Sequence, residues 1–292
     1  MTGKIIKGIA GFYYVNDGEN RVYQCRAKGI FRNRKIKPLV GDNVEFSILD
    51  EDVREGNIDG ILPRKNALVR PAAANVDQAL VLFALTQPAP NLNLLDRFLV
   101  MMAMEEIPVV ICFNKADLGD GAMEEEYKKI YEGAGYEVHF ISARDNLGMD
   151  QVRGILRGRT TVLAGPSGVG KSSLTNRIQP EASMETGGIS RKIERGKHTT
   201  RHSELFFVEK DTYMMDTPGF SSMYTPEIEA SELKEFFPEF AEFEDECRFL
   251  GCVHIGETVC GVKEAVKKGK ISPSRYENYR LIYEELKQKR RY

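Results

Sequence analysis

The clearest chemical feature of the sequence is a glycine-rich loop that fits the pattern G-x-x-x-x-G-K-[ST] in full. It follows an apolar run at 160–165 and opens a helix, which is the context the pattern requires. The glycines let backbone N–H groups turn toward phosphate oxygens, and the helix presents its positive dipole end to them. The sequence therefore predicts a nucleotide-phosphate site formed by Gly165, Pro166, Ser167, Gly168, Val169, Gly170, Lys171, Ser172 and Ser173.

Charged and hydroxyl groups complete the expected phosphate site. Lys171 would reach the β- and γ-phosphates, and the Ser172 hydroxyl would coordinate Mg²⁺. Asp216 and Gly219 belong to an Asp-Thr-Pro-Gly sequence that follows the strand-like run at 212–216. We expect the Asp216 carboxylate to hold Mg²⁺ through water and the Gly219 N–H to sense the γ-phosphate.

A second motif, Asn-Lys-Ala-Asp at 114–117, follows the apolar run at 107–113 and indicates which base is bound. The Asp117 carboxylate can accept hydrogen bonds from guanine N1–H and the 2-amino group. Adenine offers neither donor, so ATP would leave this carboxylate unpaired. Asn114 would tie the loop to the base, and the aliphatic stem of Lys115 can cover the ring face.

The dipeptide Ser142-Ala143 ends the next strand-like run, at 136–142, and fits a loop whose backbone N–H faces guanine O6. A Ser-Ala pair alone is weak, but one helix and one strand separate it from Asp117, as the two guanine motifs require. Together the two motifs predict GTP and GDP as ligands.

The order of these motifs is unusual. The base motifs at 114–117 and 142–143 precede the phosphate loop at 165–172, whereas the common GTPase arrangement begins with that loop. Hydrogen bonding depends on position in space and not on chain order, so a circular permutation preserves the site. In this order the Asp-Thr-Pro-Gly motif leads straight into the C-terminal segment, which we expect to respond to the nucleotide state.

The polar stretch at 180–203 is the expected first switch. We expect Thr200 to close onto Mg²⁺, with Thr199 as the alternative. Phe220 stands where many switch GTPases carry a glutamine that orients water, which predicts slow intrinsic hydrolysis. His198 is a candidate to position that water, the alternative being a surface histidine without a catalytic role.

A cluster of sulfur and imidazole ligands lies further along the chain, in the spacing C-x₄-C-x-H-x₅-C. Three thiolates and one imidazole complete a tetrahedral zinc shell with no open position, which is typical of a structural site. Unligated thiols are the alternative. The predicted zinc ligands are Cys247, Cys252, His254 and Cys260.

Three sections of the chain would position these motifs. Residues 1–66 hold short strand-like runs without a helix, which predicts a small barrel of the OB-fold or SH3-like type. The following section, 67–226, alternates continuous apolar runs with helix-length segments, as in a parallel sheet covered on both faces. The last section, 227–292, is charged and helical, and its apolar stripe from Tyr276 to Leu286 is adequately explained by a packed helix.

Composition constrains the class of partner. A net charge of −2 gives no general reason to bind nucleic acid, but residues 26–37 carry six basic residues and no acid. Such a patch can bind a phosphate backbone on an acidic protein, although solvated basic loops are also common. No apolar run approaches the ~20 residues that span a bilayer, and the N-terminus lacks a secretory signal, so we expect a cytoplasmic protein.

Taken together, the motifs resemble the ribosome small-subunit-dependent GTPase A family, also called RsgA or YjeQ. The resemblance covers essentially the whole chain, through the small barrel, 114–117, 165–172, Gly-Lys-His-Thr-Thr at 196–200, Asp-Thr-Pro-Gly-Phe at 216–220 and the cysteine cluster. It implies an α/β fold, with a circularly permuted P-loop GTPase domain between an N-terminal OB-fold barrel and a C-terminal α-helical zinc-binding domain.

The resemblance also implies a function. It is that of a bacterial GTPase acting late in maturation of the small ribosomal subunit, binding the 30S particle and 16S rRNA through the barrel and stimulated by that particle. GTP or GDP, Mg²⁺ and Zn²⁺ are the implied ligands; neither DNA nor a membrane is expected, and a monomer suffices.

Other classes remain as alternatives. A P-loop kinase or ATPase with a zinc module would have to tolerate adenine, against which Asp117 argues. An RNA-binding protein with a vestigial nucleotide site would not need Lys171, Ser172 and Asp216, all of which are intact.

Overall fold

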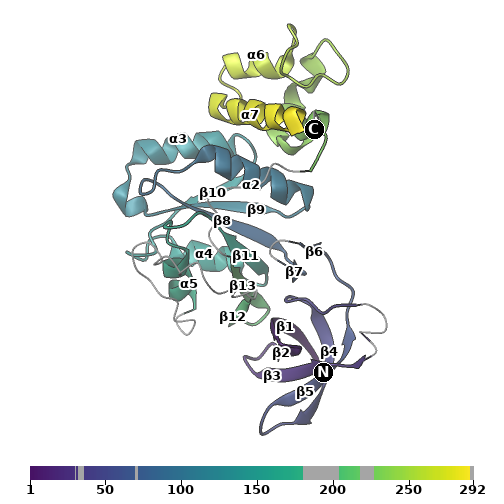
Figure 1. The fold of residues 1–292 in the computed structure, drawn as a ribbon. Helices are drawn as coiled ribbons and strands as arrows, with labels where there is room; N and C mark the ends of the chain where they lie inside the picture. Colours follow the sequence, from purple (N-terminus) through teal and green to yellow (C-terminus); the bar gives the residue numbers. More distant parts are fainter. Residues whose placement is uncertain (30, 32–35, 70–71, 180–203, 218–226, 290–292) are drawn as a thin grey trace, which may run out of the picture. The chain divides into compact units, whose positions relative to one another are not determined.

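The computed structural model describes residues 1–29, 31, 36–69, 72–179, 204–217 and 227–289 of the 292-residue chain (Figure 1). The chain divides into two compact units, Met1–Leu82 with Ser142–Gly219, and Phe83–Ile141 with Phe220–Tyr292. No described helix is long and apolar enough to cross a bilayer.

The first unit begins with a closed five-stranded barrel made of β1 (Thr2–Ile9), β2 (Phe12–Asn16), β3 (Val22–Ala27), β4 (Asn43–Asp50) and β5 (Glu55–Ile61). Its strand order is β1-β2-β3-β5-β4, and pairing of β1 with β4 closes it. Alternate residues point inward, and the buried set includes Ile5, Val15, Tyr23, Val44, Phe46 and Ile58. The predicted N-terminal barrel is confirmed, with a strand order typical of an OB-fold.

The central sheet has six strands in the order β10-β9-β8-β11-β13-β12. These are β8 (Gln78–Ala84), β9 (Val109–Asn114), β10 (Glu137–Phe140), β11 (Thr160–Ala164), β12 (Leu205–Glu209) and β13 (Thr212–Asp216). All seven residues of β8 and all five of β11 are buried, which explains why both strands become apolar after their first polar residues, from Ala79 in β8 and from Val162 in β11. The two-residue strands β6 (Ala67–Leu68) and β7 (Ala73–Ala74) pair separately ahead of β8.

One strand departs from the expected parallel sheet. The pairs β10–β9, β11–β8 and β11–β13 are parallel, but β12 runs antiparallel to β13. Only Lys210 and Asp211 connect these two strands, and a parallel pair needs a crossover of a dozen or more residues. The short connection therefore dictates a hairpin.

The helices of this region begin at identifiable caps or turns. They are α2 (Leu92–Met104), α3 (Gly121–Glu132), α4 (Met149–Leu156) and α5 (Lys171–Ile178), with a short 3₁₀ turn η1 at Ala116–Leu118. The Asn91 side chain accepts from the Leu94 N–H at the start of α2, and Asp120 accepts from Met123 at the start of α3. Helix α5 starts instead at Gly170, in a left-handed conformation, at the end of the phosphate loop.

Side chains tie the first residues of β8 to β11 within the first unit. The Thr160 N–H donates to Asp77 Oδ2 at 2.8 Å, and the Asp77 N–H donates to the Thr160 carbonyl at 2.9 Å. Gln78 is buried and donates to Thr161 Oγ1 at 3.0 Å, while Arg159 donates to Gln78 Oε1 at 2.6 Å. These four contacts, which we call the entry clamp, fix the point where the chain enters the sheet.

The barrel also contacts the hairpin strands of the same unit. Lys7 of β1 forms an ion pair with Glu204 at 3.0 Å, beside an isolated bridge between the two residues. The buried Tyr213 hydroxyl of β13 donates to Asn16 Oδ1 of β2 at 2.8 Å. Barrel and hairpin are thus joined by specific polar contacts.

The C-terminal part of the second unit is helical, with the 3₁₀ segments η3 (Ala230–Phe236) and η4 (Pro238–Glu246) followed by α6 (Gly261–Lys267) and α7 (Pro273–Lys289). Tyr279, Ile282 and Leu286 of α7 are buried in an aromatic core, and Tyr276 and Tyr283 pack against it. The predicted stripe is therefore a packing face. Arg275 of α7 is buried and bonds to Asp96 of α2, so α7 is attached to α2 by an ion pair as well.

Candidate nucleotide site and metal centre

The phosphate loop connects the end of β11 to α5. Gly165 has a φ of 153°, and a Cβ built at this position would lie 2.1 Å from the Leu82 carbonyl oxygen. Only glycine therefore fits at the first position of the loop, where the backbone rests against β8. The predicted sequence context of strand, loop and helix is observed.

The side chain of Lys171 lies along the loop. Its Nζ donates to the Gly165 carbonyl at 2.8 Å and to the Pro166 carbonyl at 2.7 Å. Burial lowers the pKa of Lys171, and the Asp216 carboxylate acts in the opposite direction. The charge that would meet a nucleotide phosphate is thus positioned by the loop's own backbone and faces Asp216.

Asp216 lies next to the end of β11. It pairs in register with Leu163, and Thr217 donates to the Leu163 carbonyl from its N–H at 3.1 Å and from Oγ1 at 2.9 Å. Ser172 is half-buried in the first turn of α5. Ser172, Lys171 and Asp216 thus belong to one corner of the first unit, which suits a bound magnesium phosphate.

The Ser142-Ala143 dipeptide also belongs to the first unit and forms a closed turn. Ser142 and Leu147 exchange backbone hydrogen bonds of 3.1 and 3.0 Å, and the Asp145 N–H donates to Ser142 Oγ at 3.1 Å. Both Ser142 and Ala143 are buried. These hydrogen bonds close the turn, as expected of a loop that offers a backbone N–H to a base.

The Asn-Lys-Ala-Asp motif lies in the second unit, at the end of β9. Asn114 is buried, whereas Asp117 is exposed on the η1 turn. Lys115 has a φ of 63°, and its ammonium donates to the Gln87 carbonyl. The Ala116 N–H donates to the carbonyl of Ile141 at 3.0 Å, the residue directly before Ser142. This hydrogen bond ties the start of η1 to the end of the segment that follows β10 within the second unit.

Several predicted residues lie outside the described part of the chain. These are His198, Thr199, Thr200 and Gly219 of the expected switches, and Arg32, Arg34 and Lys35 of the basic segment. Their roles remain predictions.

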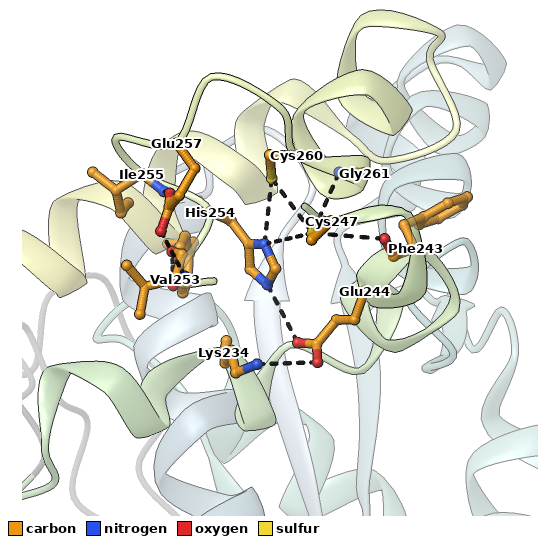
Figure 2. A network of polar contacts seen from close by, with 11 residues as sticks. Lys234, Phe243, Glu244, Cys247, Val253, His254, Ile255, Glu257, Cys260 and Gly261 are labelled. Carbon is orange, nitrogen blue, oxygen red and sulfur yellow. Dashed lines mark hydrogen bonds and ion pairs between the residues drawn. The ribbon is translucent and has the colours of Figure 1, made fainter. Parts of the chain in front are cut away.

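The cysteine cluster fits a metal ion. One ligand atom from each of Cys247, Cys252, His254 and Cys260 lies within 4.8 Å of all the others. His254 Nδ1 is 3.3 Å from Cys260 Sγ and 3.6 Å from Cys247 Sγ (Figure 2). Burial raises the pKa of the Cys252 thiol to about 12, so a thiolate here requires a cation to stabilise it. The donor set and spacing are consistent with zinc.

A second layer of contacts orients the histidine. His254 Nε2 lies 3.2 Å from Glu244 Oε1, and Glu244 Oε2 accepts from Lys234 at 3.0 Å (Figure 2). Glu257 accepts from the Val253 and Ile255 N–H groups, each at 2.9 Å, on either side of the histidine. With Nε2 engaged by a carboxylate, Nδ1 is directed to the sulfurs, as in known metal-binding histidines.

Comparisons with known proteins agree with these features. The family profile described as RsgA GTPase matches residues 61–226, and the profile described as RsgA N-terminal domain matches residues 2–58. A protein of Agathobacter rectalis named small ribosomal subunit biogenesis GTPase RsgA is 57% identical, with 100% of both chains covered. A protein of the same name from Alkaliphilus metalliredigens is 51% identical, with 99% of each chain covered.

Two solved structures are also similar. YloQ, described as a circularly permuted GTPase, matches with a TM-score of 0.79 at 39% identity, covering 99% of this chain and 95% of its own. YjeQ from Thermotoga maritima matches with a TM-score of 0.81 at 36% identity, covering 98% of each chain.

Proposed function

The chain belongs to the RsgA family of circularly permuted GTPases, and from this membership we propose that it is a GTP-hydrolysing switch that binds the small ribosomal subunit and assists its late maturation. The observation that carries the proposal is the corner formed by the phosphate loop, Lys171 and Asp216 in the first unit. The relatives named above as small ribosomal subunit biogenesis GTPases, aligned over their full length, support the biological setting.

In this proposal the phosphate loop binds the phosphates of GTP or GDP, from Gly165 to Ser173. Lys171 neutralises the β- and γ-phosphate charge, and Ser172 and Thr200 coordinate Mg²⁺ with Asp216 acting through water. The Gly219 N–H detects the γ-phosphate, and His198 positions water because Phe220 cannot do so. Hydrolysis adds that water to the γ-phosphorus and releases GDP and phosphate.

Guanine selectivity rests on the two base loops. Asp117 accepts from N1–H and the 2-amino group, and its exposure leaves the carboxylate accessible to a ligand. Asn114 and Lys115 support the base, and the Ser142-Ala143 turn offers its backbone to O6. Each loop follows the end of a strand of the central sheet, where open α/β folds bind ligands.

The barrel is the proposed contact with 16S rRNA. Arg26 lies over the Phe12 ring at 4.9 Å from its centroid, and a groove in the barrel is lined by Tyr13, Lys28, Phe31 and Lys37, among other residues. Aromatic rings beside cations suit nucleic-acid bases and phosphates. The zinc cluster would staple the C-terminal segment that follows the second switch, and this segment would respond to the nucleotide state. We propose domain boundaries of 1–66, 67–226 and 227–292, a cytoplasmic location and a monomer.

The test is GTP turnover measured with and without purified 30S subunits. We expect slow turnover by the protein alone and an increase of at least tenfold with 30S particles, as partner-supplied groups commonly give larger effects. The control is Lys171→Ala, which should abolish turnover in both conditions. Equal rates with and without 30S subunits would refute the proposed ribosomal role, and hydrolysis of ATP as fast as GTP would refute the assigned nucleotide.

A further inference from the structure

The helix that follows the phosphate loop also holds the turn proposed to read the base. Arg177 lies in the last turn of α5, and its Nε donates to the Ala143 carbonyl at 2.9 Å. Its Nη2 donates to the carbonyl of Arg144 at 2.8 Å. A guanidinium donates in a fixed planar geometry, so these two bonds set the relative orientation of two consecutive carbonyls.

Arg177 is itself held in place. Arg153 of α4 donates from Nη2 to the Arg177 backbone carbonyl at 3.0 Å, near the C-terminal end of α5. A cation at this end of a helix is favoured by the helix dipole. The far side of the turn is closed by two backbone hydrogen bonds between Ser142 and Leu147, each residue donating its N–H to the other's carbonyl. The peptide that carries the Ala143 N–H is thus held through the Ser142 carbonyl, which accepts from the Leu147 N–H, and the next peptide, which carries the Ala143 carbonyl, is held by Arg177.

We propose that Arg177 is a positioning residue for guanine specificity. By binding the carbonyls of Ala143 and Arg144, it sets the direction in which the Ala143 N–H meets guanine O6. The inference rests on the proposed function, since it concerns how the same site recognises its base. It adds a mechanical link between the phosphate-binding helix and the base-binding turn, entirely within the first unit.

The experiment compares equilibrium binding of four nucleotides to the full-length protein and to Arg177→Ala. The ligands are GDP, 6-thio-GDP, IDP and ADP. Sulfur at position 6 is a weak acceptor but leaves N1–H and the 2-amino group intact, so 6-thio-GDP isolates the contact at O6. IDP lacks only the 2-amino group, so it isolates the contact at Asp117.

We expect Arg177→Ala to bind GDP about tenfold more weakly, the size of roughly one hydrogen bond lost at guanine O6. The preference for GDP over 6-thio-GDP should fall toward unity, while the preference for GDP over IDP stays as in the parent protein. Arg177→Lys, which offers a single ammonium, should give an intermediate result. Arg157→Ala is the matched control, because Arg157 is an exposed arginine of the same unit whose partner is Glu209.

A merely structural role for Arg177 would lower both preferences together, with a matching loss of thermal stability, and that result would overturn the inference. It is also overturned if Arg177→Ala keeps the parent's preference for GDP over 6-thio-GDP. If the parent protein binds GDP no better than ADP, the proposed function fails first. If the parent protein discriminates against ADP and Arg177→Ala keeps the parent's preference for GDP over 6-thio-GDP, only the role of Arg177 is refuted and the proposed function stands.

Discussion

Replacing Arg275 by methionine tests the buried charge network of the second unit. Arg275 is 1% exposed and donates to Asp96 Oδ1 at 2.7 Å, and to both carboxylate oxygens of Glu239 at 2.7 and 3.0 Å. Asn278 donates to the other oxygen of Asp96 at 2.6 Å. Methionine keeps much of the volume of the side chain but leaves two buried carboxylates without their cation.

The magnitude follows from this geometry. The side chains of Asp96 and Glu239 are 0% and 4% exposed, so solvent cannot replace the guanidinium. Removing one partner of a buried ion pair costs about 3–5 kcal/mol, because the remaining charge stays buried and uncompensated. Arg275 also lies 4.6 Å from the centroid of Phe237, so some packing is lost as well. We therefore expect Arg275→Met to destabilise α7 by about 4 kcal/mol.

Hydrogen exchange of the α7 amides is the suitable measurement, because it reports local opening within a chain of several modules. The chain has no tryptophan, so urea unfolding would be followed by far-UV circular dichroism, with an expected midpoint shift of about 1–4 M. Arg275→Met combined with Asp96→Leu should recover part of the loss, since one unpaired charge is then removed. A single-variant effect below about 1 kcal/mol would refute the reasoning, because exposed pairs give values of that size.

Three further predictions concern the site, the barrel contact and the thiols. Asp117→Asn should change the preferred base from guanine to xanthine. Calorimetry with GDP and XDP checks this, and an unchanged preference for GDP would contradict the assigned base contact. Burial raises the pKa of Tyr213 to about 12, above the ordinary value near 10, so the contribution of its neutral hydroxyl to stability is complete below pH 10 and is lost as pH rises through 12. In Tyr213→Phe the free energy of unfolding should therefore fall less over this alkaline range than in the parent protein. Identical dependence of the unfolding free energy on pH in both proteins would refute this prediction. Burial likewise raises the pKa of Cys25 to about 11 and that of Cys112 further, so at pH 7.5 less than about 0.1% of either thiol is ionised. Neither thiol of the native protein should react rapidly with a disulfide reagent, and rapid labelling of Cys25 would contradict this prediction.

The fold was largely predictable because burial leaves a direct mark on composition. The strand β8 is buried on both faces, so after Gln78 its sequence is an uninterrupted apolar run. The barrel strands alternate, and the stripe on α7 repeats at helical spacing. The cysteine cluster was predictable for another reason, since cysteine and histidine at short spacing are chemically distinctive wherever they occur.

What the sequence did not indicate are polar contacts between distant residues. Arg275 stands in a charged segment that resembles a solvated helix face, and its burial depends on Asp96, which is 179 positions away. Arg177 is likewise an ordinary arginine at a helix end until the fold brings it to the carbonyl of Ala143. Glu244 is only ten positions from His254, but its side chain gives no signal in the sequence that it contacts the imidazole. Charged side chains carry no periodic signal for their partner, so only the assembled structure identifies them.

The entry clamp has a practical consequence for dividing the protein. Asp77 lies directly before β8 and Gln78 is its first residue, and the side chains of both bond to β11. The hydrophobic run alone therefore does not show where the folded domain begins. A fragment starting at Ala79 would lack the anchors and expose the neighbouring strand's polar groups, whereas one starting at Asn75 keeps them. In a circularly permuted domain, the strand at the new N-terminal end needs its own anchors. Here the side chains of Asp77 and Gln78 provide them by hydrogen bonding to β11.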